Sequence, residues 1–369
     1  MKCSGFIILI FLLNHKFISN KYNKIRRIIH IRLDIYPLFC KFRIVQINDR
    51  IYGRIEINDK VLLALIDSLP VQRLKGINQA GASQYVIAGK TVTRYEHSLG
   101  VMTLLRKLGA SLEEQIAGLL HDVPHTAFSH VIDFVFPSDD HAYHEKFHSD
   151  IILNSEIPSI LADYNYDVHR ILDDSNFPLL ERSIPDLCAD RIDYSLRDMT
   201  ASLGYNEKIQ SYIDNITIHN NEIIFKDPET ARRYAEDYLM MDRTRWSHPL
   251  EIAYYQILAE AMKLALEKGI LDKVELFKDD SYVYSKLQGS NDSEIKNKLS
   301  MLSPGLTILD DPDDYQFFAR NKVRYVNPKF MNGQREAQRL SETYPDFNAA
   351  LTKHIERITR GNYIKILSY

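Results

Sequence analysis

Side chains that can bind a metal ion are concentrated in one short part of this sequence. Seven of the thirteen histidines lie between residues 94 and 148, where an even distribution would place about two. The metal-capable side chains of this stretch are His97, His121, Asp122, His125, His130, Asp133, His141, His144, Glu145 and His148. A chain with this pattern has to bring imidazole and carboxylate groups together when it folds, and metal-dependent chemistry is the first hypothesis.

Two predicted helices bring part of this set together. An apolar stripe at helical spacing predicts a helix over residues 94–108, and the Ser111–Glu114 capping box opens a second helix. Because only a short turn joins them, the two helices are expected to be antiparallel. His97 on the first helix would then meet the dipeptide His121–Asp122 at the end of the second.

A third predicted helix supplies another carboxylate. It begins at Ser183–Pro185, with proline in the first turn, and reaches Gly204. Asp190 lies on this helix, with Tyr194 and Asp198 one and two steps of four residues further along the same face. Two imidazoles with two carboxylates suit Fe, Mn, Zn or Co and are poor ligands for Ca. Open coordination positions on such a metal would activate water and polarise a phosphoryl oxygen.

The rest of the sequence favours an all-α fold with small β elements. A long helical stretch is predicted over residues 230–268. Strands are predicted at Ile216–Ile218 and Ile223–Phe225, which form a small β-hairpin, and at Lys322–Val326 and Tyr363–Leu367. We therefore expect a helical core over residues 47–265 and a mixed, mainly helical C-terminal appendage over residues 266–369.

The composition of residues 1–46 differs from that of the remainder. The first fifty residues contain ten Lys or Arg and two Asp or Glu, whereas the whole chain has a net charge of −3. The apolar run Phe6–Leu13 is shorter than the roughly 20 residues that span a membrane, and no small-x-small cleavage motif follows it. We expect a leader outside the core. Contact of this leader with an anionic membrane is the alternative, since apolar residues lie beside a basic cluster.

The overall composition excludes two classes of protein. Three scattered cysteines, Cys3, Cys40 and Cys188, are incompatible with a disulfide scaffold and indicate a reducing compartment, so a cytoplasmic protein is expected. The net charge of −3 provides no basic field for nucleic acid, and no stable nucleic-acid partner is expected.

Three segments resemble the HD-domain phosphohydrolases. They are Arg94–Gly100 (RYEHSLG), His121–Asp133 (HDVPHTAFSHVID) and Ala189–Asp198 (ADRIDYSLRD). Over about residues 47–265 the chain is most similar to the branch that contains dGTP triphosphohydrolases and the SAM-domain-bearing dNTP triphosphohydrolase, although no SAM domain is recognisable ahead of the core. The resemblance implies an HD-domain helical core and hydrolysis of deoxynucleoside triphosphates to deoxynucleoside and triphosphate.

The resemblance also implies a role for individual residues. The implied ligands of a divalent transition metal are His97, His121, Asp122 and Asp190, with Mg on the nucleotide phosphates. The implied phosphate-facing and acid–base residues are His125, His130, Asp133 and His144. The implied substrate-binding residues are Arg94 at the phosphates, Tyr194 and Asp198 near the sugar, and Gln79 near the sugar and base. In this scheme His130 protonates the leaving 5′ oxygen while Asp133 orients its ring.

Two features depart from the family pattern. The segment Tyr238–Pro249 resembles a helix that bears a phosphate-binding arginine, but its register assigns this role to neither Arg243 nor Arg245. Ala80 stands where relatives often have a larger residue beside the base. The identity of that arginine and the base preference therefore stay open.

Other functions remain compatible with the sequence. A nucleotide phosphomonoesterase or a cyclic-nucleotide phosphodiesterase would use the same metal site, and a regulatory module would bind nucleotide without turnover. His144-Glu145-x-x-His148 also matches the H-E-x-x-H signature of zinc proteases, but Lys146 and Asp150 place charge where such a helix is apolar. Since relatives in the resembled branch often assemble as oligomers, a homo-oligomer is expected.

Overall fold

The computed structural model of the chain describes residues 44–137, 143–204, 207–320, 322–333 and 336–369. The predicted leader therefore lies almost entirely outside the described residues. Internal contacts divide the chain into two units, Met1–Val45 and Gln46–Tyr369, and the helices of the described residues all lie in the second. Within the described residues, every helix is too short or too polar to cross a membrane.

Short helices follow an N-terminal β-ribbon in the first half of the second unit. The ribbon consists of β1 (Val45–Asp49) and β2 (Gly53–Ile57). The helices that follow are α3 (Lys60–Asp67), α4 (Leu69–Arg73), α5 (Arg94–Lys107), α6 (Leu112–Leu120), α7 (Ile132–Val135), α8 (His148–Leu153), α9 (Ile157–Asp163), α10 (Val168–Ile171) and α11 (Ala189–Leu203). The helices α5, α6 and α11 carry most of the predicted site.

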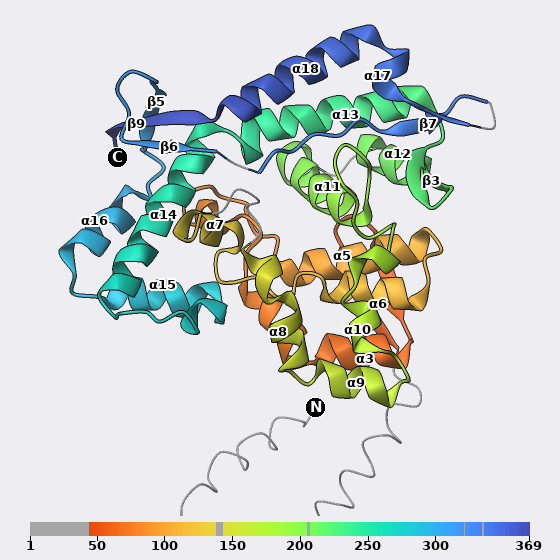
Figure 1. Ribbon diagram of the computed structural model, residues 1–369, viewed down its shortest axis with the longest axis horizontal. Helices are drawn as coiled ribbons and strands as arrows, with labels where there is room; N and C mark the ends of the chain where they lie inside the picture. Colours follow the sequence, from red (N-terminus) through yellow and green to blue (C-terminus); the bar gives the residue numbers. More distant parts are fainter. Residues whose placement is uncertain (1–43, 138–142, 205–206, 321, 334–335) are drawn as a thin grey trace, which may run out of the picture. The chain divides into compact units, whose positions relative to one another are not determined.

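The predicted antiparallel pair is present as α5 and α6, and α11 packs against α5 (Figure 1). The hydroxyl of Ser111 accepts the N–H of Glu114 at 3.1 Å, an N-cap of the kind that stabilises a helix by about 1 kcal/mol. The capping box is only half formed, because the Glu114 carboxylate accepts the N–H groups of Leu179 and Leu180 instead. The segment before α11 is thereby tied to the start of α6.

Helix α11 begins later than predicted. The chain around Ser183–Pro185 is not helical, and α11 starts at Ala189. The backbone of this segment is engaged elsewhere: the carbonyl of Pro185 accepts the N–H of Asn327, and that of Asp186 accepts from Arg191. Long-range pairing therefore outweighs the local helix-start signal.

The second half of the unit contains seven further helices, of which α14 and α18 are the longest in the described residues. They are α12 (Glu207–Asn215), α13 (Pro228–Met241), α14 (Pro249–Glu267), α15 (Asp280–Gly289), α16 (Ser293–Met301), α17 (Leu340–Thr343) and α18 (Pro345–Arg360). The single helix predicted over residues 230–268 is divided into α13 and α14. A π-helical turn, Asp242–Trp246, ends the first, and Pro249, which lacks an N–H, opens the second.

Two small sheets accompany these helices. The predicted hairpin is confirmed as β3 (Ile216–His219) and β4 (Glu222–Phe225), which pair antiparallel with Ile216 opposite Phe225. The first sheet has the order β3-β4-β7-β8, with β7 (Lys329–Met331) parallel to β4 and β8 (Ala337–Arg339) at its edge. The second has the order β5-β9-β6, from β5 (Thr307–Asp310), β9 (Asn362–Ser368) and β6 (Phe317–Ala319).

The two predicted C-terminal strands have different outcomes. Tyr363–Leu367 lies within β9, as expected. Residues 322–326 are not a strand; β7 begins only at Lys329, where Phe330 pairs with Phe225. Lys322, Val323 and Arg324 of this irregular segment instead line a cavity.

Helix α14 lies at the centre of the main hydrophobic cluster. Apolar side chains on most of its sides are buried, which is typical of a central helix. Helices α7, α15 and α16 pack around it, and α18 lies alongside α13 (Figure 1). The fold is thus the predicted all-α HD-type core with small β elements.

Candidate metal centre and substrate cavity

Four side chains from three helical regions converge on one point. His97 lies on α5, His121 and Asp122 directly follow α6, and Asp190 lies in the first turn of α11. The Nε2 atoms of the two histidines are 3.3 Å apart. Oδ1 of Asp190 lies 2.8 and 3.6 Å from these nitrogens, and carboxylate oxygens of Asp122 lie 3.8 and 3.5 Å from them. The structure thus brings together the four residues predicted as metal ligands.

The other ring nitrogens determine what the two histidines present to this point. Nδ1 of His121 lies 2.8 Å from the carbonyl oxygen of Gly118, which only accepts, so this nitrogen carries a proton. Nδ1 of His97 lies 2.7 Å from the Asp193 carboxylate, which also receives Nε of Arg197. A neutral ring at either position presents the lone pair of Nε2 to the other ring and to two carboxylates, so the cluster takes up a positive charge, either a proton on His97 or a metal ion. A cation is needed among these acceptors, and mixed nitrogen and oxygen ligands suit a divalent transition metal.

The pKa values of the cluster indicate the same demand for positive charge. Burial opposes charge on His97, but hydrogen bonds to Asp190 and Asp193 outweigh it and raise the pKa of His97 to about 10. Burial also opposes ionisation of Asp122, yet the Arg94 guanidinium holds the pKa of that carboxyl well below its usual range. Hydrogen bonds from the two histidines likewise lower the pKa of Asp190 against the effect of burial. The carboxylates are therefore ionised.

Two further histidines line the space beside the metal cluster. Nε2 of His125 lies 3.1 Å from Oδ1 of Asp122. Burial and then the Arg94 charge lower the pKa of His125, so a neutral ring donates to that carboxylate and orients it. Nδ1 of His130 lies 3.0 Å from the buried Asp133 carboxylate, in the arrangement expected from the sequence.

A strained turn separates these two histidines. Phe128 and Ser129 have φ angles of 62° and 52°, in the left-handed region that bulky residues avoid. The N–H of Phe128 donates to Asp280 at 2.7 Å, and the hydroxyl of Ser129 donates to the carbonyl of Asn78 at 2.8 Å. A second oxygen of Asp280 accepts the N–H of Asn78, so one buried carboxylate holds two loops of the site.

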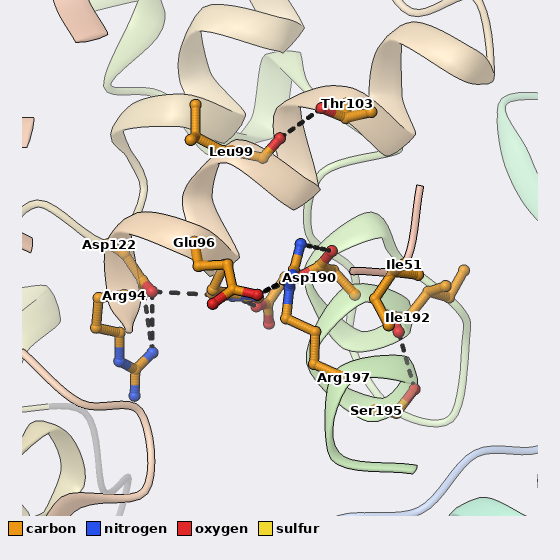
Figure 2. Close-up of polar contacts among 12 residues, drawn as sticks. Ile51, Arg94, Glu96, Leu99, Thr103, Asp122, Asp190, Ile192, Ser195 and Arg197 are labelled. Atoms are coloured by element: carbon orange, nitrogen blue, oxygen red, sulfur yellow. Dashed lines mark hydrogen bonds and ion pairs between the residues drawn. The ribbon is translucent and has the colours of Figure 1, made fainter. Parts of the chain in front are cut away.

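The predicted phosphate-binding Arg94 contacts a predicted metal ligand directly. Its Nη1 lies 3.1 and 3.0 Å from the two oxygens of Asp122, and its Nε donates to Ser129 at 2.9 Å (Figure 2). The side chain is buried but lines the cavity. Arg94 therefore orients Asp122 as well as adding positive charge to the cavity wall.

The cavity has a volume of about 310 Å³ and extends along α11. Asp190, Tyr194 and Asp198 line it from one helix face, spanning about 12 Å at 1.5 Å per residue. The hydroxyl of Tyr194 is hydrogen-bonded to that of Tyr238, and Asp198 accepts Nε1–H of Trp246 at 2.6 Å. Gln79 and Ala80 line the same cavity.

Sequence reasoning missed several side chains of this cavity. They are Lys90, His148, Arg191, Trp246, Glu251, Lys322 and Arg324. His148 fits a surface helix by sequence, yet it lines the cavity, and burial lowers its pKa. Trp246 is the only tryptophan of the chain, and this could have indicated a binding role from the sequence. No sequence signal pointed to Lys322 and Arg324, because they come from an irregular segment far along the chain from α11.

Two ambiguous sequence features become clearer. Arg243 lines a second cavity, together with Arg357, and does not line the metal-side cavity. A guanidinium in the metal-side cavity comes instead from Arg324, in another segment. In the H-E-x-x-H stretch, His144–Phe147 is a 3₁₀ turn and α8 starts at His148. The two histidines therefore do not share one continuous α-helix, as the protease signature requires. The side chains of His144 and Glu145 lie outside the described residues.

Comparisons with known proteins agree with this geometry. Residues 94–198 match the HD domain. The chain is 40% identical over 327 residues to the uncharacterized protein YdhJ of Bacillus subtilis, covering 88% of this chain and 99% of that one. It is 30% identical over 321 residues to the metal-dependent phosphohydrolase cns2 of Cordyceps militaris, covering 84% and 92%.

Two further similarities are more limited. A stretch of 102 residues is 41% identical to the deoxynucleoside triphosphate triphosphohydrolase SAMHD1 of Bos taurus, covering 24% of this chain and 17% of that one. A crystal structure of a hypothetical protein from Aquifex aeolicus superposes with a TM-score of 0.62 at 21% identity, covering 83% and 94%. This last likeness concerns the fold alone.

Proposed function

Because this chain belongs to the HD-domain metal-dependent phosphohydrolases, we propose that it hydrolyses deoxynucleoside triphosphates to a deoxynucleoside and triphosphate. The observation that carries this proposal is the position of the His97, His121, Asp122 and Asp190 cluster in the wall of a cavity about 310 Å³ in volume, with His130 and Asp133 beside it. The local similarity to SAMHD1 supports the choice of substrate.

The four clustered residues would hold a divalent Fe, Mn, Zn or Co ion. When bound, such a metal would lower the pKa of a coordinated water and polarise a phosphoryl oxygen. Arg94 and His125 hold the Asp122 carboxylate in place from two sides. His130, with Nδ1 fixed by Asp133, would give a proton through its other ring nitrogen to the leaving 5′ oxygen.

The remainder of the cavity suits an anionic nucleotide. Arg191, Lys322 and Arg324 bring cationic groups to its wall, and cationic donors bind phosphate oxygens strongly. Aromatic side chains of Tyr194 and Trp246 line the same space and offer faces for a sugar or a base. Its extent of about 12 Å along α11 matches a nucleoside with its first phosphate.

The test is an analysis of the phosphate products. The purified full chain is incubated with all four dNTPs and Mn²⁺, and triphosphate, pyrophosphate and orthophosphate are resolved by ³¹P NMR. Asp122→Ala serves as the control, since it removes a ligand and its charge. We expect triphosphate from the parent and none from the variant.

Each other outcome would redirect the proposal. Orthophosphate or pyrophosphate would identify a different phosphoesterase that uses the same metal centre. Metal binding without any product would contradict hydrolysis of dNTPs and favour a different phosphoester or a nucleotide-binding module.

A further inference from the structure

We propose that Asp49, Arg197 and Asp193 form a positioning chain that holds the ring of His97 and thereby sets the metal affinity of the centre. The N-terminal β-ribbon, which precedes the matched HD region at 94–198, would then be a working part of the metal site. The inference rests on metal binding at His97 and is independent of which phosphoester is the substrate.

The first link is the hydrogen bond behind His97. Its Nδ1 lies 2.7 Å from Oδ2 of Asp193, and both side chains are fully buried. This bond fixes the protonated nitrogen and the plane of the ring, and so determines where Nε2 points. Carboxylates behind metal-binding histidines commonly affect metal affinity by about 10- to 100-fold.

The second link is the guanidinium of Arg197, which holds Asp193 in that orientation. Nε donates to Oδ2 of Asp193 at 2.7 Å and Nη2 to Oδ1 at 3.1 Å, a two-point contact along α11. The i,i+4 spacing of Asp193 and Arg197 makes this ion pair a common stabilising feature of a helix. Because Asp193 also binds Nδ1 of His97, the ion pair affects the metal site as well: rotation of Asp193 would move the imidazole.

The third link reaches the β-ribbon. Nη2 of Arg197 also donates to Oδ2 of Asp49 at 2.8 Å, and this carboxylate is 2% exposed. Oδ1 of Asp49 accepts the N–H groups of Ile51 and Tyr52, so the turn fixes the carboxylate. One oxygen of Asp49 therefore binds the turn, and the other binds Arg197.

Helix α5 closes the arrangement from the side of His97. Glu96, the residue before His97, accepts Nη1 of Arg197 at 2.9 Å (Figure 2). Glu96 also accepts Nη2 of Arg50 in the ribbon turn. Gly100 lies against the guanidinium, and a Cβ there would be 1.9 Å from Nη2 of Arg197. The helix is thus shaped to admit Arg197 at this place, one turn beyond the metal ligand.

The experiment measures binding of Mn²⁺ to the chelator-treated full chain by titration calorimetry. Asp49→Asn keeps an oxygen for the turn N–H groups but presents an amide in place of the carboxylate to Arg197. We expect the Mn²⁺ dissociation constant to rise about fivefold to tenfold, and about 10- to 100-fold for Asp193→Asn. Arg197→Lys, which keeps the charge but loses the fork, is expected to lie between them.

Asp59→Asn is the matched control. Asp59 follows the same ribbon and pairs with Arg106 at the far end of α5. Like Asp49, it therefore connects the ribbon region to a helix through an aspartate–arginine contact. This pair does not touch His97 or Asp193. Because its side chains are 32% and 26% exposed, we expect the control to lower the thermal unfolding midpoint less than Asp49→Asn does, while leaving the Mn²⁺ dissociation constant within about twofold of the parent.

A double variant tests whether Asp49 acts through Asp193. If it does, Asp49→Asn adds little to the loss already caused by Asp193→Asn, whereas independent effects would multiply. Parent-like Mn²⁺ affinity in both Asp49→Asn and Arg197→Lys would overturn the proposal. So would an equal loss in Asp59→Asn, or a fully multiplicative double variant. If Asp49→Asn does not fold, Arg197→Lys and Asp193→Asn still decide the first two links.

Discussion

Two buried clusters of this protein use the same residue types to different ends. The metal cluster contains His97, His121, Asp122 and Asp190, while the cluster at the π-helical turn contains Asp242, Ser247, His354 and Arg357. In the first, histidine Nε2 atoms and carboxylates face one another. In the second, a hydroxyl, a guanidinium and an imidazole converge on one oxygen of a single carboxylate, whereas its other oxygen and Nε of Arg357 have no hydrogen-bond partner among the described residues.

In the second cluster, three side chains contact the same carboxylate oxygen. Oδ2 of Asp242 accepts the Ser247 hydroxyl at 2.6 Å and Nη2 of Arg357 at 2.9 Å. Nε2 of His354 lies 3.2 Å from the carbonyl of Arg324, so it carries a proton and also points to Asp242 at 3.3 Å. The Nε2 proton of His354 meets a backbone carbonyl, as in a structural histidine, whereas the Nε2 atoms of His97 and His121 face each other and two carboxylates, an arrangement that suits a metal ion.

The second cluster also holds part of the cavity wall in place. Asp242 opens the π-helical turn that ends in Trp246, and Arg324 carries the carbonyl that His354 binds. Trp246 and Arg324 both line the cavity. The comparison therefore predicts that the metal cluster controls chemistry and the second cluster controls stability and the shape of the cavity wall.

The largest expected effect separates the two clusters. Asp190→Ala removes a proposed ligand, and we expect kcat to fall by about a thousandfold or more, with loss of bound metal. Saturating Mn²⁺, at about 100 times its dissociation constant, should stabilise the parent by about 2.7 kcal/mol and should not stabilise the variant. Metal analysis and thermal unfolding with and without Mn²⁺ check this. Retained activity and Mn²⁺ stabilisation in Asp190→Ala would show that the two clusters do not differ in metal binding as predicted.

The converse change is Asp242→Asn. It leaves the buried ends of Arg357 and His354 without a counter-charge, and breaking a buried pair costs about 3 to 5 kcal/mol. Since the Arg357 side chain is one-third exposed, we expect the lower end, about 3 kcal/mol, in urea unfolding of the metal-free protein. Metal content should equal that of the parent. Loss of metal at unchanged stability would show that the cluster serves the metal site.

Arg324 joins the two regions and sharpens the comparison. Arg324→Gln keeps the backbone carbonyl that His354 binds but removes a cation from the cavity wall. We expect KM for a triphosphate substrate to rise about tenfold, with Mn²⁺ affinity unchanged. Arg320→Gln, on an exposed side chain of the same segment, is the control. An equal effect of both variants on KM would mean that only the general charge of the segment matters.

A third buried carboxylate gives the smallest expected effect. The partners of Asp280 are uncharged N–H groups, and burial raises its pKa from 3.8 to about 6. Its folded-state pKa is higher than its unfolded one, so the folded state binds more protons between these values and gains stability as the pH falls. The stability deficit of Asp280→Asn should therefore grow by about 1 kcal/mol from pH 7 to pH 5.

Urea unfolding of both metal-free proteins at the two pH values measures this difference. Because the other titrating groups are common to both proteins, their contributions cancel. A deficit that is constant or shrinks on acidification would show that the N–H donors keep Asp280 ionised, as charged partners do in the other clusters.

Local sequence pattern determined the helices that carry the metal cluster. Helix α5 starts and ends within one residue of the predicted positions, and helix α6 starts at its predicted cap, because these caps and apolar stripes lie within their own sequence. The positions of His97, His121 and Asp122 on them follow directly. The hairpin Ile216–Phe225 was predictable for the same reason, since its turn and both strands are contiguous.

Where a distant segment competes, the same signals fail. Glu114 leaves its capping box for the N–H groups of Leu179 and Leu180, and the helix predicted from Ser183 starts at Ala189 because its backbone pairs with distant residues. In both cases a partner far along the chain outweighed a local preference of about 1 kcal/mol.

The sequence by itself determined which residues could form a metal centre and which helices would present them. Only the tertiary structure decided their surroundings: that Arg94 binds Asp122, that Asp49 reaches Asp193 through Arg197, and that residues 322–324 close the cavity. Helical periodicity acts over a few residues and is written into the local pattern. The partners of a buried charge are chosen from the whole folded chain, because each buried ion needs the donors or acceptors that packing brings to it.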